Sequence, residues 1–538
     1  MKKARNPLRF LALVEVAAYH RARATKGFRV KPIFRRWYRK FKSRIERRLD
    51  KKHHIDSSRP AFTARNINYD VSFRDHGMAC GGIGAIHLLV QELGLADAID
   101  RHLHVLKIHQ PYHESDHVLN IAYNALCNGT CLEDIELRRN DEAFLDALGT
   151  QRIPDPTTAG DFCRRFERSD ITHLHKAIDE VRLQVWAEQP RSFLNRATID
   201  MDGTLVATTG ACKAGMDIAY NGTWGYHPLI LSLAETGEVL SLVNRSGNRP
   251  SHEGAAAQVD RSIWLCLRAG FDSIVLRGDT DFSQTEHLDR WNAVREVRFV
   301  FGYNAMANVV ALAQRLPASV WQPLQRPEKY KVKTQRRQRP DKVKDRIVRE
   351  REFDVLRLQS EEVAEFDYRP TACAHTYRMV VVRKHISKEK GERTLFPQVR
   401  YFFYITNERQ WTPAEVVFEA NDRCDQENLL AQLHGGVRAL QAPVNTLESN
   451  WAWMVMTALA WTLKAWWALL LPESPGRWQA QHREEKQRVL RMEFKAFVNA
   501  FVTIPCQVIR TSRRLVLRVL GWNPHLMTFF RLVSRLRR

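Results

Sequence analysis

The chain has few cysteines and no recognisable cysteine pattern. Its 538 residues include nine cysteines and no C-x-x-C pair, which argues against a disulfide scaffold and the usual zinc-finger spacings. No internal repeat is present, and the apolar run 10–16 lacks a small-residue cleavage site and is followed by basic residues. These features predict a cytoplasmic protein with buried thiols and no secretory signal.

Long apolar runs are equally scarce. The segment 451–472, "WAWMVMTALAWTLKAWWALLLP", is long enough to cross a bilayer, but it carries Lys464 near its middle. A lone run of this kind in a chain of hydrophilic average favours a core helix of a large globular protein over a membrane span. The sequence therefore predicts no membrane partner.

Acidic residues are too few to balance the basic ones. Sixty Asp and Glu stand against 83 Lys and Arg, a formal net charge of +23, and such an excess favours a polyanionic partner, most simply nucleic acid. The excess is concentrated in 1–52, with nineteen basic and three acidic residues, and in 326–351, with twelve and four. One charged run is commonly only a solvated surface. Two runs with interleaved aromatics such as Trp37 and Tyr330 predict contacts with the phosphate backbone.

The length and the changes in pattern along the chain predict several domains. Apolar residues first recur at helical spacing, and from residue 196 strands alternate with helices. We expect strands at 196–208, 227–234, 238–244, 272–279, 296–304 and 399–407, and helices over about 253–269, 283–294, 305–315 and 412–434. The predicted domains are a basic arm (1–60), a mostly helical DNA-binding region (61–190), the first part of a catalytic core (191–325), a basic β-rich insertion (326–398), the second part of the core (399–472), and a basic helical C-terminal region (473–538) that includes "IRTSRRLVLRVL".

Two predicted strands carry acidic residues where burial is expected. Asp200 and Asp202 lie in "IDMDGT" and point to the same face of a strand, because strand side chains alternate. Two carboxylates on one face repel each other unless something compensates their charge. Asp279, in "VLRGDTDF", follows a hydrophobic strand at its carboxyl end, where α/β sheets commonly place their active sites.

A third acid lies on the helix predicted over 412–434. Arg423, Glu427 and His434 fall near one line of that helix, beside leucines that would face the core. An Arg423–Glu427 surface pair is the simpler interpretation, and it would contribute only a few tenths of a kcal/mol. Each acid alone is therefore more typical of a solvated or structural residue than of a catalytic one.

The ordered set of motifs is more specific than its parts. The chain resembles the DDE transposases of bacterial insertion sequences, most closely the "group 1" DDE domain family, whose catalytic domain has the ribonuclease-H-like fold of the retroviral-integrase superfamily. The resemblance lies in "IDMDGT", "AYNGTWGYHPLILSLAETGEVLSLVNRSGN", "VLRGDTDF" and "RCDQEN". It implies an α/β fold: a mixed sheet flanked by helices and interrupted by a β-rich insertion, with helical N- and C-terminal regions.

The resemblance also implies a chemistry. Two Mg²⁺ ions, for which Mn²⁺ would substitute, would be held by Asp202, Asp279 and Glu427. Asp202 is assigned as the first ligand because it directly precedes Gly203-Thr204, with Asp200 as an auxiliary acid, either a further ligand or a support behind the ligands; the resemblance leaves the order of these two aspartates open. The implied activity is cleavage of double-stranded DNA at the element ends and strand transfer into target DNA. The implied partners are transposon-end and target DNA and a second copy of the chain, in the bacterial cytoplasm at the nucleoid.

The third motif departs from a pattern that related elements share. A tyrosine and a lysine often accompany the arginine and the glutamate there, but this chain has Ala420 and His434 in their places. Arg423 and His434 are still expected to contact DNA near the cut, His434 only weakly when neutral. A hairpin route of cleavage is therefore not carried over from those relatives.

Two alternatives compete with this hypothesis. The motif His113-Glu114-x-x-His117 matches a zinc metalloprotease, but Ser115 is the expected start of the helix, which leaves His113 outside it and removes the required spacing. The chain could instead be a catalytically silent transposase kept as a DNA-binding protein. The presence of all three acids argues against that alternative.

Overall fold

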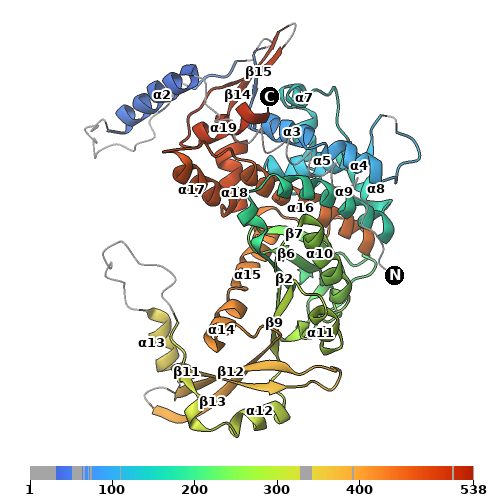
Figure 1. Cartoon of the computed structure of the whole chain (residues 1–538). Coiled ribbons are helices and arrows are strands. Elements are labelled where there is room, and N and C mark those ends of the chain that lie inside the picture. The colour runs from blue at the N-terminus through green and yellow to red at the C-terminus, as the bar shows by residue number, and fades with distance from the viewer. Residues whose placement is uncertain are drawn as a thin grey trace. The chain divides into compact units, whose positions relative to one another are not determined.

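The structure is a computed structural model in which the chain forms two compact units. Unit 1 contains residues 1–194, 204–249 and 428–538, and unit 2 contains residues 195–203 and 250–427 (Figure 1). Most of the predicted basic arm and most of the basic run 326–351 lie outside the described residues. The described residues are 32–50, 64, 67–70, 72, 75–109, 111–326, 342–390, 393–511 and 514–536.

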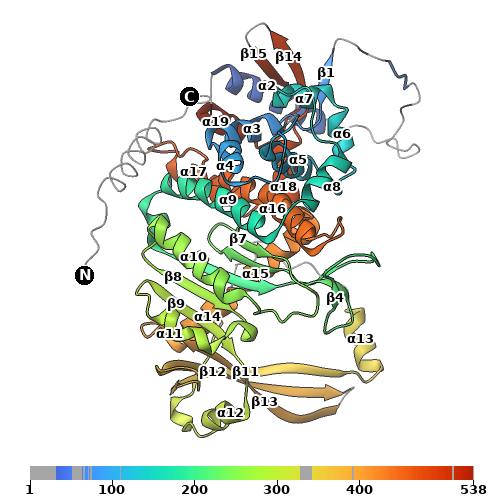
Figure 2. The same ribbon diagram turned by 90° about the vertical axis from the view of Figure 1, so that its right-hand side faces the viewer.

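Unit 2 is built on a mixed sheet. Strands β2 (Ala197–Gly203), β8 (Ile274–Gly278) and β9 (Val297–Tyr303) are parallel neighbours in the order β9-β8-β2. These strands are almost wholly buried, as expected for parallel strands with helices on both faces. Figures 1 and 2 show α10 (Ala255–Ala269) and α11 (Thr285–Asn292) on one face of the strands and α14 (Pro413–Asn421) on the other.

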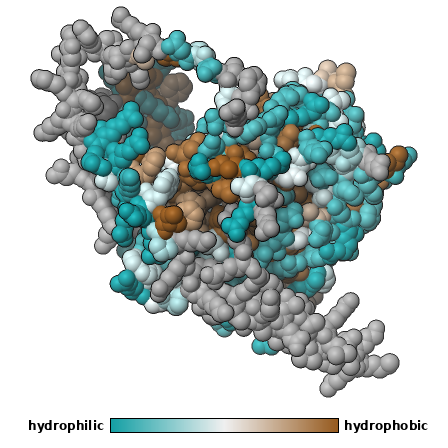
Figure 3. Space-filling view, turned by 90° about the horizontal axis from the view of Figure 1, so that it is seen from above, coloured by the Kyte–Doolittle hydropathy of each residue, from teal (hydrophilic) through white to brown (hydrophobic). Residues whose placement is uncertain are grey.

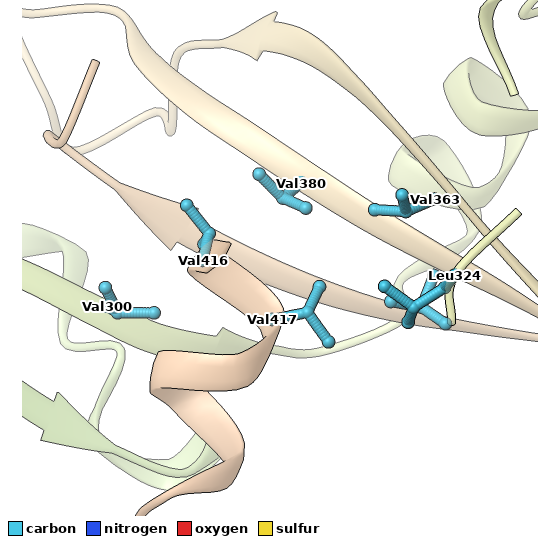
Figure 4. Close-up of a cluster of buried hydrophobic side chains, with 7 residues drawn as sticks. Val300, Leu324, Val363, Val380, Val416 and Val417 are labelled. Carbon is cyan, nitrogen blue, oxygen red and sulfur yellow. The ribbon is translucent and has the colours of Figure 1, made fainter. Parts of the chain in front are cut away.

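Antiparallel strands in and beside the predicted insertion extend this sheet: β11 (Asp354–Tyr368) and β12 (Tyr377–Lys390) lie within 326–398, and the strand predicted over 399–407 is part of a longer strand that begins at Arg393. This longer strand, β13 (Arg393–Thr406), pairs with β9, and β12, β11 and β10 (Gln322–Pro323) follow outward in that order. Apolar side chains of these strands pack against α14 and bury a cluster that includes Val380, Val416 and Val417 (Figure 4). Further helices of this unit are α12 (Ala307–Gln314) and α13 (Val343–Glu350).

Unit 1 surrounds the apolar helix α16 (Leu447–Leu469), of which nearly every residue is buried. Its Lys464 donates a hydrogen bond to the carbonyl of Leu490, 2.8 Å away, at the C-terminal end of α17 (Gln479–Leu490), and burial lowers the pKa of Lys464 to about 7. The prediction of a core helix is confirmed. Among the described helices, none is long and apolar enough to cross a membrane.

A buried glutamate joins three elements of unit 1. The Glu238 carboxylate, on β7 (Glu238–Val243), is fully buried and accepts hydrogen bonds from Arg182 and Trp186 of α9 (Arg168–Ala187) and from Trp466 of α16. Such a charge is tolerated in a core only because its oxygens are satisfied. The other elements of this part are α3 (Ile83–Glu92), α4 (Leu95–His102), α5 (Glu114–Leu126), α6 (Ile135–Arg139), α7 (Glu142–Leu148), α8 (Pro156–Arg164), β3 (Val206–Ala207), β4 (Asp217–Ile218), β5 (Trp224–Tyr226) and β6 (Leu229–Leu233).

The C-terminal region corrects the sequence prediction. The segment predicted as a basic helix forms the antiparallel strands β14 (Cys506–Thr511) and β15 (Arg514–Val519), and β1 (His76–Met78) pairs with β14. In "RLVLRV" every second residue is apolar and points to one face, so the strand period of two overrides the helical interpretation. The helices of this region are α17, α18 (Phe494–Phe497) and α19 (Leu526–Leu536).

The described part of the basic arm is the helix α2 (Pro32–Asp50). Its aromatic side packs on the C-terminal region: the ring of Phe34 stacks on Phe530 at 4.5 Å, and Tyr38 lies 6.0 Å from Trp522. Its arginines and lysines are exposed.

Seen from above, the visible face is mainly hydrophilic, with hydrophobic residues gathered near its centre (Figure 3).

The expected fold class is confirmed. The chain is α/β, with a mixed sheet flanked by helices and a β-rich insertion. Along the chain, β2 is followed by the short strands β3 to β5, the hairpin of β6 and β7, and then α10, β8, α11 and β9, which is the alternation of strands and helices that the sequence predicted from residue 196 on. The first strand is shorter than predicted, since β2 ends at Gly203.

Candidate active site

The first two predicted acids lie beside each other because of strand register. In the parallel pair β2–β8, Asp200 is opposite Arg277. Asp202 follows two residues later on β2, and Asp279 follows two residues after Arg277, directly after the end of β8. Side chains two residues apart share a face, so this register directs the two carboxylates to the same side at the carboxyl ends of the strands. Asp279 is fixed by a turn in which its Oδ1 accepts the backbone N–H of Asp281 at 2.9 Å.

The electrostatics of Asp202 and Asp279 show that they interact. Burial raises the pKa of Asp202 to about 6, the negative charge of Asp279 raises it too, and the guanidinium of Arg423 opposes both effects. Burial likewise raises the pKa of Asp279. Two carboxylates that resist ionisation together form a site that favours a cation.

Asp200 has a different partner and is closed off. Its side chain is 1% exposed and receives two hydrogen bonds from Arg277, Nε to Oδ1 at 2.6 Å and Nη2 to Oδ2 at 2.7 Å. Arg277 also contacts Glu419 of α14 at 3.0 Å, and Glu419 is paired with Arg196. The charge of Asp200 is therefore compensated by an arginine within a network that links β2, β8 and α14.

The predicted long helix over 412–434 is interrupted, which corrects the sequence prediction. α14 ends at Asn421 and α15 (Cys424–Ala431) begins after a break that contains Arg423. Arg423 directs Nη1 to Oδ2 of Asp202 at 3.0 Å. The positively charged group beside the Asp202 carboxylate is therefore the guanidinium of a residue in this break.

The other two residues of the third motif, Glu427 and His434, lie beyond this break, in α15 and in the turn that follows it. Glu427 is exposed on the first turn of α15. His434 lies in a π-helical turn (Gln432–Gly436) with Nε2 3.0 Å from the hydroxyl of Thr204, and burial lowers the pKa of His434, which favours the neutral ring. The regular line of Arg423, Glu427 and His434 predicted on one helix is therefore wrong.

Comparison with known proteins identifies the family. The family model "Transposase DDE domain group 1" matches residues 71–538. The chain belongs to this family of DDE transposases. A solved structure described as "Cryo-EM structure of piggyBac transposase synaptic complex with hairpin DNA" matches with a TM-score of 0.33 and 9% identity over 80% of this chain and 83% of that chain. No curated protein sequence matches.

Membership of a DDE transposase family implies a divalent metal ion, and two of the three predicted ligands fit one. Asp202 and Asp279 offer hard carboxylate oxygens in register at the ends of adjacent strands, which suits such a cation. Glu427 is not placed with them: among the described residues, no group of three or more His, Cys, Asp or Glu could hold a metal ion. The structure thus brings together two of the three residues that were predicted as ligands, and their binding of a metal stays a prediction.

The metalloprotease alternative is excluded by geometry. His113 is the N-cap of α5 and lies outside the helix, as predicted, although the helix begins at Glu114 rather than at Ser115. Glu114 is buried and accepts the backbone N–H groups of Val105 and Leu106. His117 packs flat on Phe162, and burial lowers its pKa to about 4. Both backbone donors bond to Oε1 of Glu114, and its Oε2 lies 3.1 Å from Nε2 of His109. The carboxylate is therefore engaged in structural contacts rather than placed as the general base of a zinc site.

Arg277 is the residue that sequence reasoning missed. The signal was present in "VLRGD", where an arginine stands inside an otherwise apolar strand, two residues before Asp279. The spacing repeats that of Asp200 and Asp202. Each of the two strands has a charged residue two positions before an acid. When such strands are neighbours, the first two residues are expected to form a buried ion pair, and the two acids are expected to lie side by side beyond it.

Proposed function

We propose that the chain is an active DNA transposase that cleaves DNA at the ends of an insertion sequence and transfers the cut strand into target DNA. The single observation that supports the proposal is the β2–β8 register, in which Asp200 lies opposite Arg277, so that Asp202 and Asp279 each follow two residues later at the carboxyl ends of adjacent buried strands. Family membership supports the reaction class.

In the proposed mechanism, Asp202 and Asp279 would hold divalent cations, Mg²⁺ or Mn²⁺, and Glu427 would complete the set. When bound, the metal ions would activate water or a DNA 3′-hydroxyl and stabilise the leaving oxygen. The Asp200–Arg277 pair holds the two strands in register below the carboxylates. Because Glu427 forms no metal-holding group with Asp202 and Asp279 among the described residues, its participation requires α15 to rearrange when DNA and metal bind.

The proposed partner is double-stranded DNA, both transposon end and target. The net charge of +23 and the exposed basic residues of α2 support contact with the phosphate backbone. His434, held neutral, would contribute a hydrogen bond rather than a charge. We further propose that two copies act together at a pair of ends, in the bacterial cytoplasm at the nucleoid.

A direct test uses labelled DNA that contains the element end. The full chain is incubated with this DNA and Mg²⁺, and nicking is compared with that of Asp279→Ala and of the matched control Asp281→Asn. Asp281 lies two residues away and contacts Asp279 through its backbone N–H, so the control removes a nearby carboxylate while keeping that bond. Nicking that persists in the control and disappears in Asp279→Ala supports the proposal.

A second candidate function follows from the position of Glu427. Because the described residues contain no complete group of three metal ligands, a catalytically silent DNA-binding protein is the alternative. Specific binding of end DNA by the wild-type chain without nicking under Mg²⁺ or Mn²⁺ would favour that function and contradict the proposed activity.

A further inference from the structure

The acid pair of the proposed site already has a positive partner. Asp202 Oδ1 accepts the backbone N–H of Gly203 at 2.8 Å, and Oδ2 faces Nη1 of Arg423 at 3.0 Å. Both oxygens therefore have donors. A metal ion that binds Oδ2 of Asp202 comes close to this guanidinium, so the two cations repel each other there.

Arg423 is held much less firmly than the arginine below it. Arg277 makes two hydrogen bonds to Asp200 and is 6% exposed, whereas Arg423 makes one to Asp202 and is 21% exposed. Arg423 also lies in the break between α14 and α15, outside regular helical structure. A single, partly solvated ion pair is a weak interaction, so this arginine can be exchanged at low cost.

We propose that Arg423 is a built-in counter-ion that competes with the divalent cation for Asp202 and, once displaced, is free to contact a DNA phosphate. This inference rests on the proposed function, since it concerns the same metal site. In the metal-free chain the guanidinium neutralises the acid pair. When metal binds, repulsion between the two cations drives Arg423 away from Asp202, and a planar guanidinium suits a phosphate.

The competition makes a prediction opposite to that for an ordinary supporting residue. Loss of a residue that positions a metal ligand weakens metal binding, whereas loss of a competing cation strengthens it. Arg423→Gln should therefore bind Mn²⁺ more tightly in the absence of DNA. With DNA present it should cleave less, because the variant has no guanidinium to bind the phosphate.

The experiment is a Mn²⁺ titration of the full chain without DNA, followed by electron paramagnetic resonance of free Mn²⁺. We expect Arg423→Gln, and Arg423→Met as a second variant without a polar head, to bind Mn²⁺ about tenfold more tightly than wild type. Arg423→Lys should stay near wild type because it keeps the charge. The matched control is Arg409→Gln, which removes the same charge from an exposed pair with Asp367 in unit 2 and should change the affinity less than about twofold.

Each outcome separates the counter-ion role from the metal site itself. Equal Mn²⁺ affinity in wild type and both Arg423 variants, with binding lost in Asp202→Asn, would overturn the counter-ion role and leave the proposed site intact. Weaker binding in Arg423→Gln and Arg423→Met, with unchanged thermal unfolding, would overturn it in favour of a positioning role. Binding that is unaffected by Asp202→Asn and Asp279→Asn would overturn both proposals.

Discussion

Two aspartates, two residues apart on strand β2, differ in burial and in the number of bonds they make to arginine. Asp200 is buried with Arg277 across the β2–β8 rung and both its oxygens are bonded. Asp202 lies at the end of the strand, is 17% exposed, and has a single bond to Arg423. The residue types are the same in both pairs, so position relative to the strand end decides whether an acid–arginine pair is closed or exchangeable.

The difference has a physical origin. Within the sheet, neighbouring strands and α14 exclude water, and a charge survives there only when it is fully bonded. At the carboxyl end of the strand the backbone leaves the sheet, so side chains can accept a new partner. One strand can therefore carry a structural pair and a functional pair in succession.

The largest expected effect is the loss of activity when Asp202, the acid of the outer Asp202–Arg423 pair, is replaced. Asp202→Asn should reduce Mg²⁺-dependent nicking of end DNA by at least about 10³-fold, because a neutral amide cannot hold the metal ions on which the rate depends. The measurement is the single-turnover nicking rate with labelled DNA. A variant that cleaves within a factor of ten of wild type would remove Asp202 from the proposed site.

The inner pair, Asp200 and Arg277, should affect the stability of the fold rather than the activity. Arg277→Met should lower the free energy of unfolding by about 3 kcal/mol, because it leaves the buried Asp200 carboxylate without its partner. Urea denaturation measures this effect. The double variant Asp200→Leu/Arg277→Met should recover much of the loss, since no uncompensated charge remains. A double variant as unstable as the single one would show that the pair does more than satisfy its own charge.

The ionised form of Asp202 should destabilise the folded chain, so that its effect on stability depends on pH. Since the folded pKa of Asp202 is raised to about 6, above its unfolded value, the folded chain binds the proton more tightly. Its favourable contribution is complete below about pH 4 and is lost as pH rises through 6. Asp202→Asn should therefore be about 2 kcal/mol more stable than wild type at pH 8 and gain little at pH 4. An equal gain at both pH values would contradict the assigned shift.

The smallest effect concerns basic residues with no part in either pair. Arg39 and Lys40 are exposed on α2, so the variant Arg39→Gln/Lys40→Gln should weaken DNA binding modestly and leave nicking at saturating DNA unchanged. The slope of log K against log salt should fall by about 0.9 for each phosphate that the variant no longer neutralises. An unchanged slope would show that these residues of α2 do not touch DNA.

Much of the fold could be predicted because its strands and helices have clear periods. Strands β6 to β9 follow from short apolar runs bounded by turns, and Gly237, at φ +70°, forms the turn expected between β6 and β7. The break at Arg423 could not be predicted, because "EANDRCDQEN" has no proline or glycine to stop a helix. The β14–β15 hairpin was missed because its basic residues also suit a helix.

The candidate site was predicted only in part, for a related reason. That Asp202 and Asp279 meet depends on strand register, which a single sequence does not specify; the order of motifs indicated it. Arg277 and Glu419 were missed because their role depends on which strand and helix lie beside Asp200. The position of Glu427 depends on the same helix break, and its place in the site stays a prediction.

The most direct test of the central claim is to map where the chain binds a divalent cation. Fe²⁺ bound in place of Mg²⁺ generates hydroxyl radicals in the presence of ascorbate and peroxide, and these cut the backbone beside the metal. With the wild-type chain, we predict cuts next to Asp202 and next to Asp279, both suppressed by excess Mg²⁺ and absent from Asp279→Asn. Cuts confined to other segments, such as the histidine-rich 102–117, would contradict the claim that these two aspartates form the metal site.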